Sequence, residues 1–229
     1  MNPGQQMYDD DGVQVCLFPL PFLIVTQWNG VNTYSHCCGH PVDYGTYQEP
    51  HPVYAPFDCH LVRNTGTAAH TLMYCSDTKV RTPSGLQWVT IQLTHAANPP
   101  YLQNAKQGDL IYYSGKAGAA AVHLHMDQTF VKDADWYACG LICDGGMTGM
   151  QMNGSVNPND VFYVNDTTLT NTGGHTWVEF TPSGPTPPEP PDPPDPPDPP
   201  APPDPGPGPS GGLFKWWLAK QLFNRRNNM

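Results

Sequence analysis

Two histidines separated by a single residue, His123 and His125, have the clearest capacity for chemistry in this sequence. They lie in a short apolar segment, residues 122–126, and residues two apart in a β-strand project from the same face. Two imidazoles would then stand side by side, one able to bind a metal ion and the other able to transfer protons. Taken alone, such a pair is a weak signal, because ordinary surface or buried histidines are its commoner explanation.

Three upstream residues extend this pair into a possible metal site. His36 and Asp43 are seven residues apart, and imidazole and carboxylate are both good zinc ligands. His95 follows a segment of strand-like composition. Two histidines and one aspartate around zinc leave a fourth position open, which distinguishes a catalytic zinc site from a structural one.

Other residues near His36 compete for the same role. His40 lies three residues before Asp43, and the thiols of Cys37 and Cys38 directly follow His36. A thiolate is a strong zinc ligand, so these residues remain alternatives to His36. The other four histidines are interpreted as ordinary polar residues: His51, His60, His70 and His175.

The elements that must position these side chains are predicted to be β-strands. In residues 88–94 the apolar side chains of Val89, Ile91 and Leu93 alternate with more polar ones. A period of two and a β-branched composition indicate a strand. Residues 82–85, Thr-Pro-Ser-Gly, predict a turn between this strand and an earlier one.

Two further short strands, residues 161–164 and 177–180, are expected to close the domain. The sequence up to residue 181 contains no convincing long amphipathic helix. The predicted fold class is therefore all-β, with mainly antiparallel sheet.

Proline usage divides the chain. Of 28 prolines, 17 fall between Pro182 and Pro209. Such a segment cannot bury a core and is expected to form extended polyproline II, reaching roughly 85 Å at ~3.1 Å per residue. We expect a folded domain over residues 1–181, a proline-rich linker over 182–212, and a short apolar and basic helix over 213–229 that anchors the chain.

Charge and cysteine content narrow the function further. The chain has a net charge of −10, and residues 1–181 hold 15 acids against 6 bases, which argues against a nucleic-acid partner. Seven cysteines match no paired zinc-ribbon spacing, so free thiols in a protein made in a reducing cytoplasm are expected.

The start of the chain does not resemble a signal peptide. Three consecutive aspartates occupy residues 9–11, where a positive segment would be needed. The apolar run at residues 15–25 contains two prolines and is too short to span a bilayer. If the protein acts on a cell wall, a route other than general secretion is expected to deliver it.

Four stretches together resemble the lysostaphin-like zinc metallopeptidases, in the version carried by bacteriophages. The spacing of seven between His36 and Asp43 is similar to that of many phage members, and the third stretch carries Gly115 and Gly118. The stretches occur in family order and span roughly residues 26–130: residues 26–43, 52–59, 107–118 and 123–125.

The resemblance implies a lysostaphin-like β fold with a duplicated hybrid motif and one zinc ion (Zn2+). By position, the ligands would be His36, Asp43 and His125, and the catalytic pair would be His95 and His123. One imidazole would accept a proton and the other would stabilise the oxyanion or protonate the leaving amine; which does which stays open. Asp58 is expected to be structural.

One departure from the family pattern concerns the residues before the histidine pair. Residues 119–122 read Ala-Ala-Ala-Val, where the family usually has a glycine. This departure puts in doubt the shape of the substrate groove beneath the site, but not the identity of the metal ligands.

The resemblance also implies a zinc-dependent endopeptidase that cleaves peptide bonds of bacterial peptidoglycan. The proline-rich stalk and apolar tail favour a phage tail-tip lysin, made in the host cytoplasm, carried in the virion and acting at the cell wall. Other phage tail proteins would then be its partners through residues 182–229. The alternatives are a structural tail-tip plug or binding protein, a free endolysin, and a tail that contacts membrane directly. Which peptide bond is cut stays open.

Overall fold

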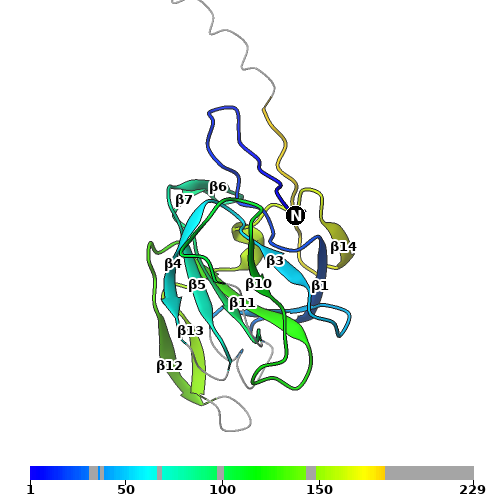
Figure 1. Cartoon of the computed structure of the whole chain (residues 1–229), viewed down its shortest axis with the longest axis vertical. Helices are drawn as coiled ribbons and strands as arrows, with labels where there is room; N and C mark the ends of the chain where they lie inside the picture. Colours follow the sequence, from blue (N-terminus) through cyan, green and yellow to red (C-terminus); the bar gives the residue numbers. More distant parts are fainter. Residues whose placement is uncertain (31–35, 37–38, 66–68, 97–100, 143–147, 184–229) are drawn as a thin grey trace, which may run out of the picture. The chain divides into compact units, whose positions relative to one another are not determined.

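Short β-strands make up almost all of the regular structure (Figure 1). The computed structural model describes residues 1–30, 36, 39–65, 69–96, 101–142 and 148–183. Within these residues the elements are β1 (Phe22–Gln27), β2 (Val42–Gly45), β3 (Pro52–Tyr54), β4 (Cys59–Asn64), β5 (Leu72–Ser76), β6 (Val80–Thr82), β7 (Gly85–Gln87), β8 (Thr90–Thr94), β9 (Asn104–Ala105), β10 (Leu110–Tyr113), β11 (His123–Thr129), β12 (Trp136–Ile142), β13 (Thr148–Met152), the 3-10 turn η1 (Pro158–Asp160) and β14 (Thr168–Asn171).

One sheet organises these strands. In the described part of the chain it has eight strands in the order β14-β1-β2-β11-β8-β5-β4-β9. β14 and β1 are parallel, and the other neighbours are antiparallel. Three further pairs, β3–β10, β6–β7 and β12–β13, are two-stranded. The prediction of a mainly antiparallel, all-β fold is confirmed for these residues.

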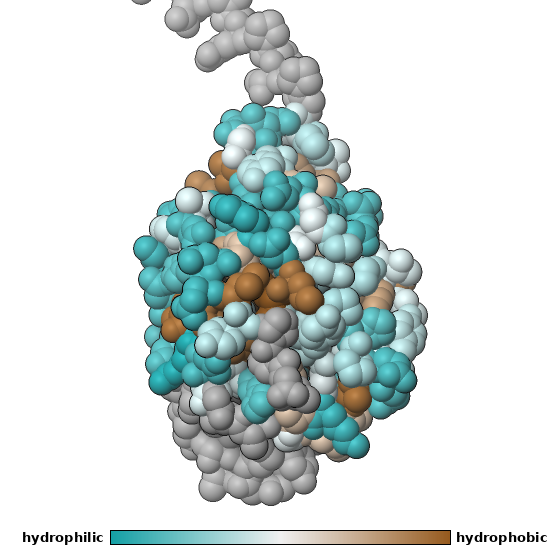
Figure 2. Space-filling model, in the orientation of Figure 1, coloured by the Kyte–Doolittle hydropathy of each residue, from teal (hydrophilic) through white to brown (hydrophobic). Residues whose placement is uncertain are grey.

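Alternation along the strands sends one face of the sheet into the core. Leu124 and Met126 of β11 are fully buried in the main apolar cluster, as are Ile91 and Leu93 of β8. Phe18 lies at the centre of this cluster, with its ring 5.0 Å from that of Tyr44 and 5.6 Å from that of Trp177, both in edge-on geometry. Edge-on packing of aromatic rings adds to the free energy of burying them. The face of the molecule shown in Figure 2 is largely hydrophilic, with an apolar patch near its centre and a few smaller apolar areas around it.

The opposite face of the sheet is covered by polar contacts. Thr90 and Gln92, which alternate with the core residues of β8, are also buried. The Thr90 hydroxyl donates to the carbonyl of Val131 (2.7 Å), and the buried Asp127 carboxylate accepts from the backbone N–H of Met152 (2.8 Å). These hydrogen bonds hold the segments on either side of the β12–β13 hairpin against the sheet. The alternation of apolar and polar residues therefore predicts which face of the sheet Thr90 and Gln92 lie on, but it does not predict that they are buried.

The prediction of strands at residues 161–164 and 177–180 is wrong, because neither segment forms a strand in the structure. These segments meet through a hydrogen bond from Val164 N–H to the Val178 carbonyl (3.0 Å), without forming a ladder. Trp177 explains the irregular path, because its ring is buried against Phe18 and its indole N–H donates to the Thr172 carbonyl (3.2 Å). Packing of one large side chain thus sets the backbone direction there.

The predicted turn at residues 82–85 is confirmed, but it joins β6 to β7. The strand predicted over residues 88–94 begins at Thr90. Before that point, Val89 is held by a separate contact, in which its N–H donates to the Ser76 hydroxyl (3.1 Å). The chain therefore makes a small hairpin before it enters the main sheet.

The chain divides into two compact units, residues 1–187 and 188–229. Most of the predicted linker over 182–212, and the whole predicted helix over 213–229, lie outside the described residues. Among the residues that are described, no helix combines the length and apolar composition needed to cross a membrane.

Replacing Phe18 with alanine should lower the free energy of unfolding by about 3–5 kcal/mol, because the cavity left in an aromatic core collapses poorly. Urea denaturation of the full chain would measure this. Tyr101→Ala is the control, since Tyr101 is 54% exposed and its loss should change stability by less than about 0.5 kcal/mol. Equal losses in the two variants would contradict the central place given to Phe18.

Candidate metal centre

Asp43 and His125 face each other across neighbouring strands. In the register of the sheet, His125 of β11 lies opposite Asp43 of β2 on one side and opposite Thr94 of β8 on the other. Directly opposed residues of an antiparallel pair have Cβ atoms about 4.5–5.5 Å apart and share a face. His123 lies two residues earlier, opposite Gly45. The face of the sheet away from the core therefore gathers both histidines of the pair and the aspartate.

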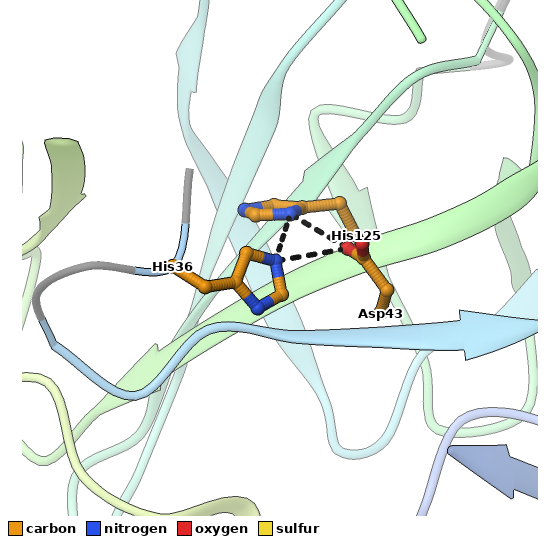
Figure 3. Close-up of side chains that lie close together, drawn as sticks. All are labelled: His36, Asp43 and His125. Carbon is orange, nitrogen blue, oxygen red and sulfur yellow. Dashed lines mark hydrogen bonds and ion pairs between the residues drawn. The ribbon is translucent and has the colours of Figure 1, made fainter. Parts of the chain in front are cut away.

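His36 reaches this group from the chain that precedes β2. Its Nε2 atom lies 3.1 Å from Asp43 Oδ1 and 3.2 Å from His125 Nδ1, and His125 Nδ1 lies 2.9 Å from Asp43 Oδ1 (Figure 3). Zinc bonds of about 2.0–2.1 Å put two tetrahedral ligands about 3.3 Å apart. The three atoms are thus spaced almost as zinc ligands would be. Two ring nitrogens and a carboxylate also match the donor atoms that zinc prefers.

The surroundings of His36 and Asp43 favour the forms that bind a metal. The Nδ1 atom of His36 lies 3.4 Å from the Trp28 carbonyl, and an N–H there leaves Nε2 with its lone pair. Burial raises the pKa of the Asp43 carboxyl, but hydrogen bonds with His123, His125 and His36 outweigh it and hold that pKa well below its usual range. At neutral pH, Asp43 is therefore an anionic ligand.

His95 and His123 lie beside the three ligand atoms. Their ring centroids are 4.6 Å apart, and the His95 ring is 5.7 Å from that of His125. The Nδ1 atoms bond backbone carbonyls, that of Ala117 for His95 (2.8 Å) and that of Ala121 for His123 (2.9 Å). Nδ1 therefore carries the proton in each neutral ring; Nε2 of His95 can then accept a proton, whereas Nε2 of His123 faces Asp43.

The two rings differ in electrostatic environment. Burial, followed by the charge of His125, lowers the pKa of His95 to about 4. Burial also acts to lower the pKa of His123, but its hydrogen bond to Asp43 and the Asp43 charge outweigh this, so that pKa is raised. His123 Nε2 lies 3.4 Å from Asp43 Oδ1. Pairs of groups whose pKa values are pushed apart can divide acid and base roles.

The backbone of His95 is held in an unusual conformation. Its φ of 88° is in the left-handed region, which costs energy for a residue with a side chain. His95 N–H donates to the Ala69 carbonyl (2.8 Å), and Ala117 N–H donates to the His95 carbonyl (2.9 Å). Gly115 makes this approach possible, because a Cβ there would lie 2.3 Å from the His95 carbonyl oxygen. No local pattern of residues predicts this contact.

The competing ligands take other positions or lie outside the described residues. His40 bonds the loop after β13: its Nδ1 is 2.8 Å from the Ser155 carbonyl and its backbone N–H donates to the Ser155 hydroxyl (2.9 Å). Ser155 in turn donates to Asp127. This chain of contacts anchors His40, which lies shortly before β2. Cys37 and Cys38 are not among the described residues.

Most of the remaining histidines, and Asp58, make local contacts. The His175 ring stacks on Trp28 with centroids 3.6 Å apart, and the His51 ring packs edge-on against Phe22. Asp58 pairs with Lys106 (2.6 Å). His60 is different, because a carboxylate lies at each of its ring nitrogens.

Comparison with known proteins gives only partial similarity. No protein-family model and no curated protein matches the sequence. Among solved structures, the chain is similar to LytU, with 19% identity and a TM-score of 0.36 over 48% of this chain and 77% of that one. It is also similar to a zinc-containing peptidase from Vibrio cholerae, with 16% identity and a TM-score of 0.35 over 54% of this chain and 42% of that one. The chain thus spans less than half the length of the second structure.

Asp43→Ala should lose one equivalent of bound zinc relative to the unchanged chain. Removal of one of three protein ligands should weaken binding by more than the roughly 10–100-fold typical of losing an outer hydrogen-bond partner. Dialysis against zinc followed by elemental analysis would measure this. Asp11→Ala is the matched control, since Asp11 is 81% exposed. An Asp43→Ala chain with full zinc content would rule out Asp43 as a ligand.

Proposed function

We propose that the chain is a zinc-dependent endopeptidase that cleaves peptide bonds of bacterial peptidoglycan. The observation that carries this proposal is the meeting of His36 Nε2, Asp43 Oδ1 and His125 Nδ1 within 3.2 Å of one another, with two more histidines alongside. Three protein ligands leave a further position for solvent or substrate. When bound, zinc supplies Lewis acidity, which polarises a carbonyl and makes a water molecule more acidic.

Two histidines of the chain are assigned the proton-transfer steps. His95 is assigned as the general base, because its Nδ1 is tied to the Ala117 carbonyl and its neutral ring can accept a proton at Nε2. His123 is assigned to stabilise the oxyanion or to protonate the leaving amine, since its Nε2 already lies on the Asp43 side of the site. The constraint on His95 keeps its ring in place without help from the substrate.

Peptidoglycan as the substrate rests on the sequence resemblance to lysostaphin-like peptidases. Two of the resembling stretches contain β3 and β10, which pair with each other, Leu110 opposite Tyr54. The same stretch after β10 then meets the start of β11, where Gly115 and His123 exchange two backbone hydrogen bonds (3.1 and 3.0 Å). The resembling stretch at residues 107–118 therefore borders the candidate site at Gly115, as a substrate-binding segment should.

We also propose that the enzyme belongs to a phage virion and acts from the tail tip at the cell wall. Composition supports this: a proline-rich segment at residues 182–212 is suited to a spacer, and the apolar and basic segment at 213–229 is suited to docking on other tail proteins. A free endolysin and a structural tail-tip protein are the alternatives. The presence of all five site residues favours an active enzyme over a purely structural role.

His95→Ala and His123→Ala should each keep zinc but lower kcat by ~10²–10⁴-fold, the usual contribution of a general acid or base. Mass analysis of peptides released from purified peptidoglycan of several cell-wall types would measure turnover and identify the bond cut. His51→Ala is the histidine control, since its ring contacts aromatic side chains away from the ligand atoms. A metal-free His123→Ala chain would mean that His123 and His125 exchange roles.

A chain that ends at residue 184 should hydrolyse soluble muropeptides at the rate of the full chain but should no longer attach to virions. Residues 185–229 offer prolines, scattered carboxylates and an apolar, basic tail, and they contain no histidine, the residue type of four of the five proposed site residues. Hydrolysis assays and co-sedimentation with particles would measure the two properties separately. Loss of hydrolysis on truncation would instead place the tail within the active fold.

A further inference from the structure

A second group of potential metal ligands lies on the same face of the sheet as the first. His60 of β4 is directly opposite Cys75 of β5, and Cys75 is opposite Thr90, the first residue of β8. The first centre lies at the other end of β8, where Thr94 is opposite His125. Opposed residues share a face, so both groups project away from the core but from opposite ends of the same strands.

Asp133 completes this second group. It follows β11 in the chain, and its Oδ1 lies 2.8 Å from His60 Nε2, while its backbone N–H donates to Cys75 Sγ (3.3 Å). One ligand atom from each of His60, Cys75 and Asp133 lies within 4.8 Å of the others. Three elements that are distant in sequence therefore bring a nitrogen, a sulfur and an oxygen together.

Asp77 supplies the partner that metal-binding histidines usually have. Its Oδ1 lies 2.8 Å from His60 Nδ1. An N–H at Nδ1 that donates to Asp77 leaves the lone pair of Nε2 directed at the Asp133 side, which is the carboxylate–histidine–metal arrangement. A protonated His60 held between two aspartates would give the same distances without a metal. The Cys75 thiol accepts the Asp133 N–H in either case, so measured metal content decides between the ion pair and a metal site.

We propose that His60, Cys75 and Asp133 bind a second divalent cation of the zinc class, with Asp77 orienting His60. A nitrogen, sulfur and oxygen donor set favours zinc-like transition ions over magnesium or calcium. Binding would release the Cys75 thiol proton to solvent. His60 is 34% and Asp133 48% exposed, so an ion can reach the site and solvent can supply a fourth ligand.

This second metal ion would stabilise the fold rather than take part in catalysis. Asp133 lies in the segment that Thr90 already ties to the sheet through the Val131 carbonyl. A cation shared by β4, β5 and this segment would fix the entry to the β12–β13 hairpin. The site is separate from the proposed catalytic centre, so neither proposal depends on the other.

Cobalt substitution of the full chain separates the two sites. The proposed ligands of the first centre contain no sulfur, so a near-ultraviolet sulfur-to-cobalt absorption band reports the second. The metal-stripped chain reloaded with Co2+ should take up two equivalents and show this band. Cys75→Ala should lose one equivalent and the band, whereas Asp43→Ala should lose the other equivalent and keep the band.

Two controls cover three of the six other thiols, those within two residues in sequence of a proposed ligand of either centre. Cys59→Ala removes the thiol next to His60 on β4 that faces the core, and it should leave both equivalents and the band. A Cys37→Ser, Cys38→Ser double variant, at the two residues that follow His36 in the sequence, should also keep the band, because the band is assigned to Cys75. Loss of the band in the double variant, with Cys75→Ala unchanged, would overturn the proposal.

Surface variants keep the test valid if Cys75→Ala fails to fold. Asp77→Asn should weaken the second equivalent by about 10–100-fold, the usual effect of losing an orienting partner, and Asp133→Asn should weaken it further. Titration of the stripped chain with zinc would measure both. Uptake of a single equivalent by the unchanged chain, or unaltered affinity in Asp133→Asn, would show an ion pair without a metal.

Discussion

The register of β11 between β2 and β8 is the constraint on which the site depends. It places His125 opposite Asp43 and beside the end of β8, from which the chain turns into His95. Because side chains alternate, a shift of one residue would turn His125 into the core and bring Leu124 or Met126 out of it. Burial of those two apolar side chains therefore stabilises the alignment of the ligands as well as the core.

Strands alone supply only part of the site. His36 and His95 come from irregular segments, whose conformation has to be fixed by contacts that are not part of a ladder. Asp127, two residues beyond His125 on the same face, accepts hydrogen bonds from Met152 N–H and the Ser155 hydroxyl, and Ser155 holds His40. A buried carboxylate is costly unless it is hydrogen-bonded in this way. Its contacts join the strand that carries His125 to the loop that leads from His36.

The sequence allowed prediction of those features that depend on local periodicity. The period of two placed His123 and His125 on one face, and it identified β8 to within two residues. It could not place the chain around Trp177, where packing against Phe18 overrides the pattern. The approach of Gly115 to His95 also had no local signal, because 20 residues separate the two.

The cluster of His60, Cys75 and Asp133 is a second case in which residues distant in sequence meet without a local sequence signal. From the sequence alone, His60 is interpreted as an ordinary polar residue. Its two carboxylate partners are 17 and 73 positions away, so no local pattern of residues indicates the cluster. Side-chain alternation gives His60 and Cys75 a common face only once the β4–β5 register is known.

Both clusters arise from one property of this sheet, which is that its outer face is polar and yet largely covered. A polar face in contact with other chain segments must satisfy its hydrogen-bonding groups, and here the segments before and after the β12–β13 hairpin do so for Thr90, Asp127 and Thr129. Where such a face carries several imidazole, carboxylate or thiol groups together, it presents the donor types that zinc-like ions prefer. The cover therefore does more than shield the sheet: it determines which polar side chains of this face are already hydrogen-bonded to backbone, as Thr90, Asp127 and Thr129 are.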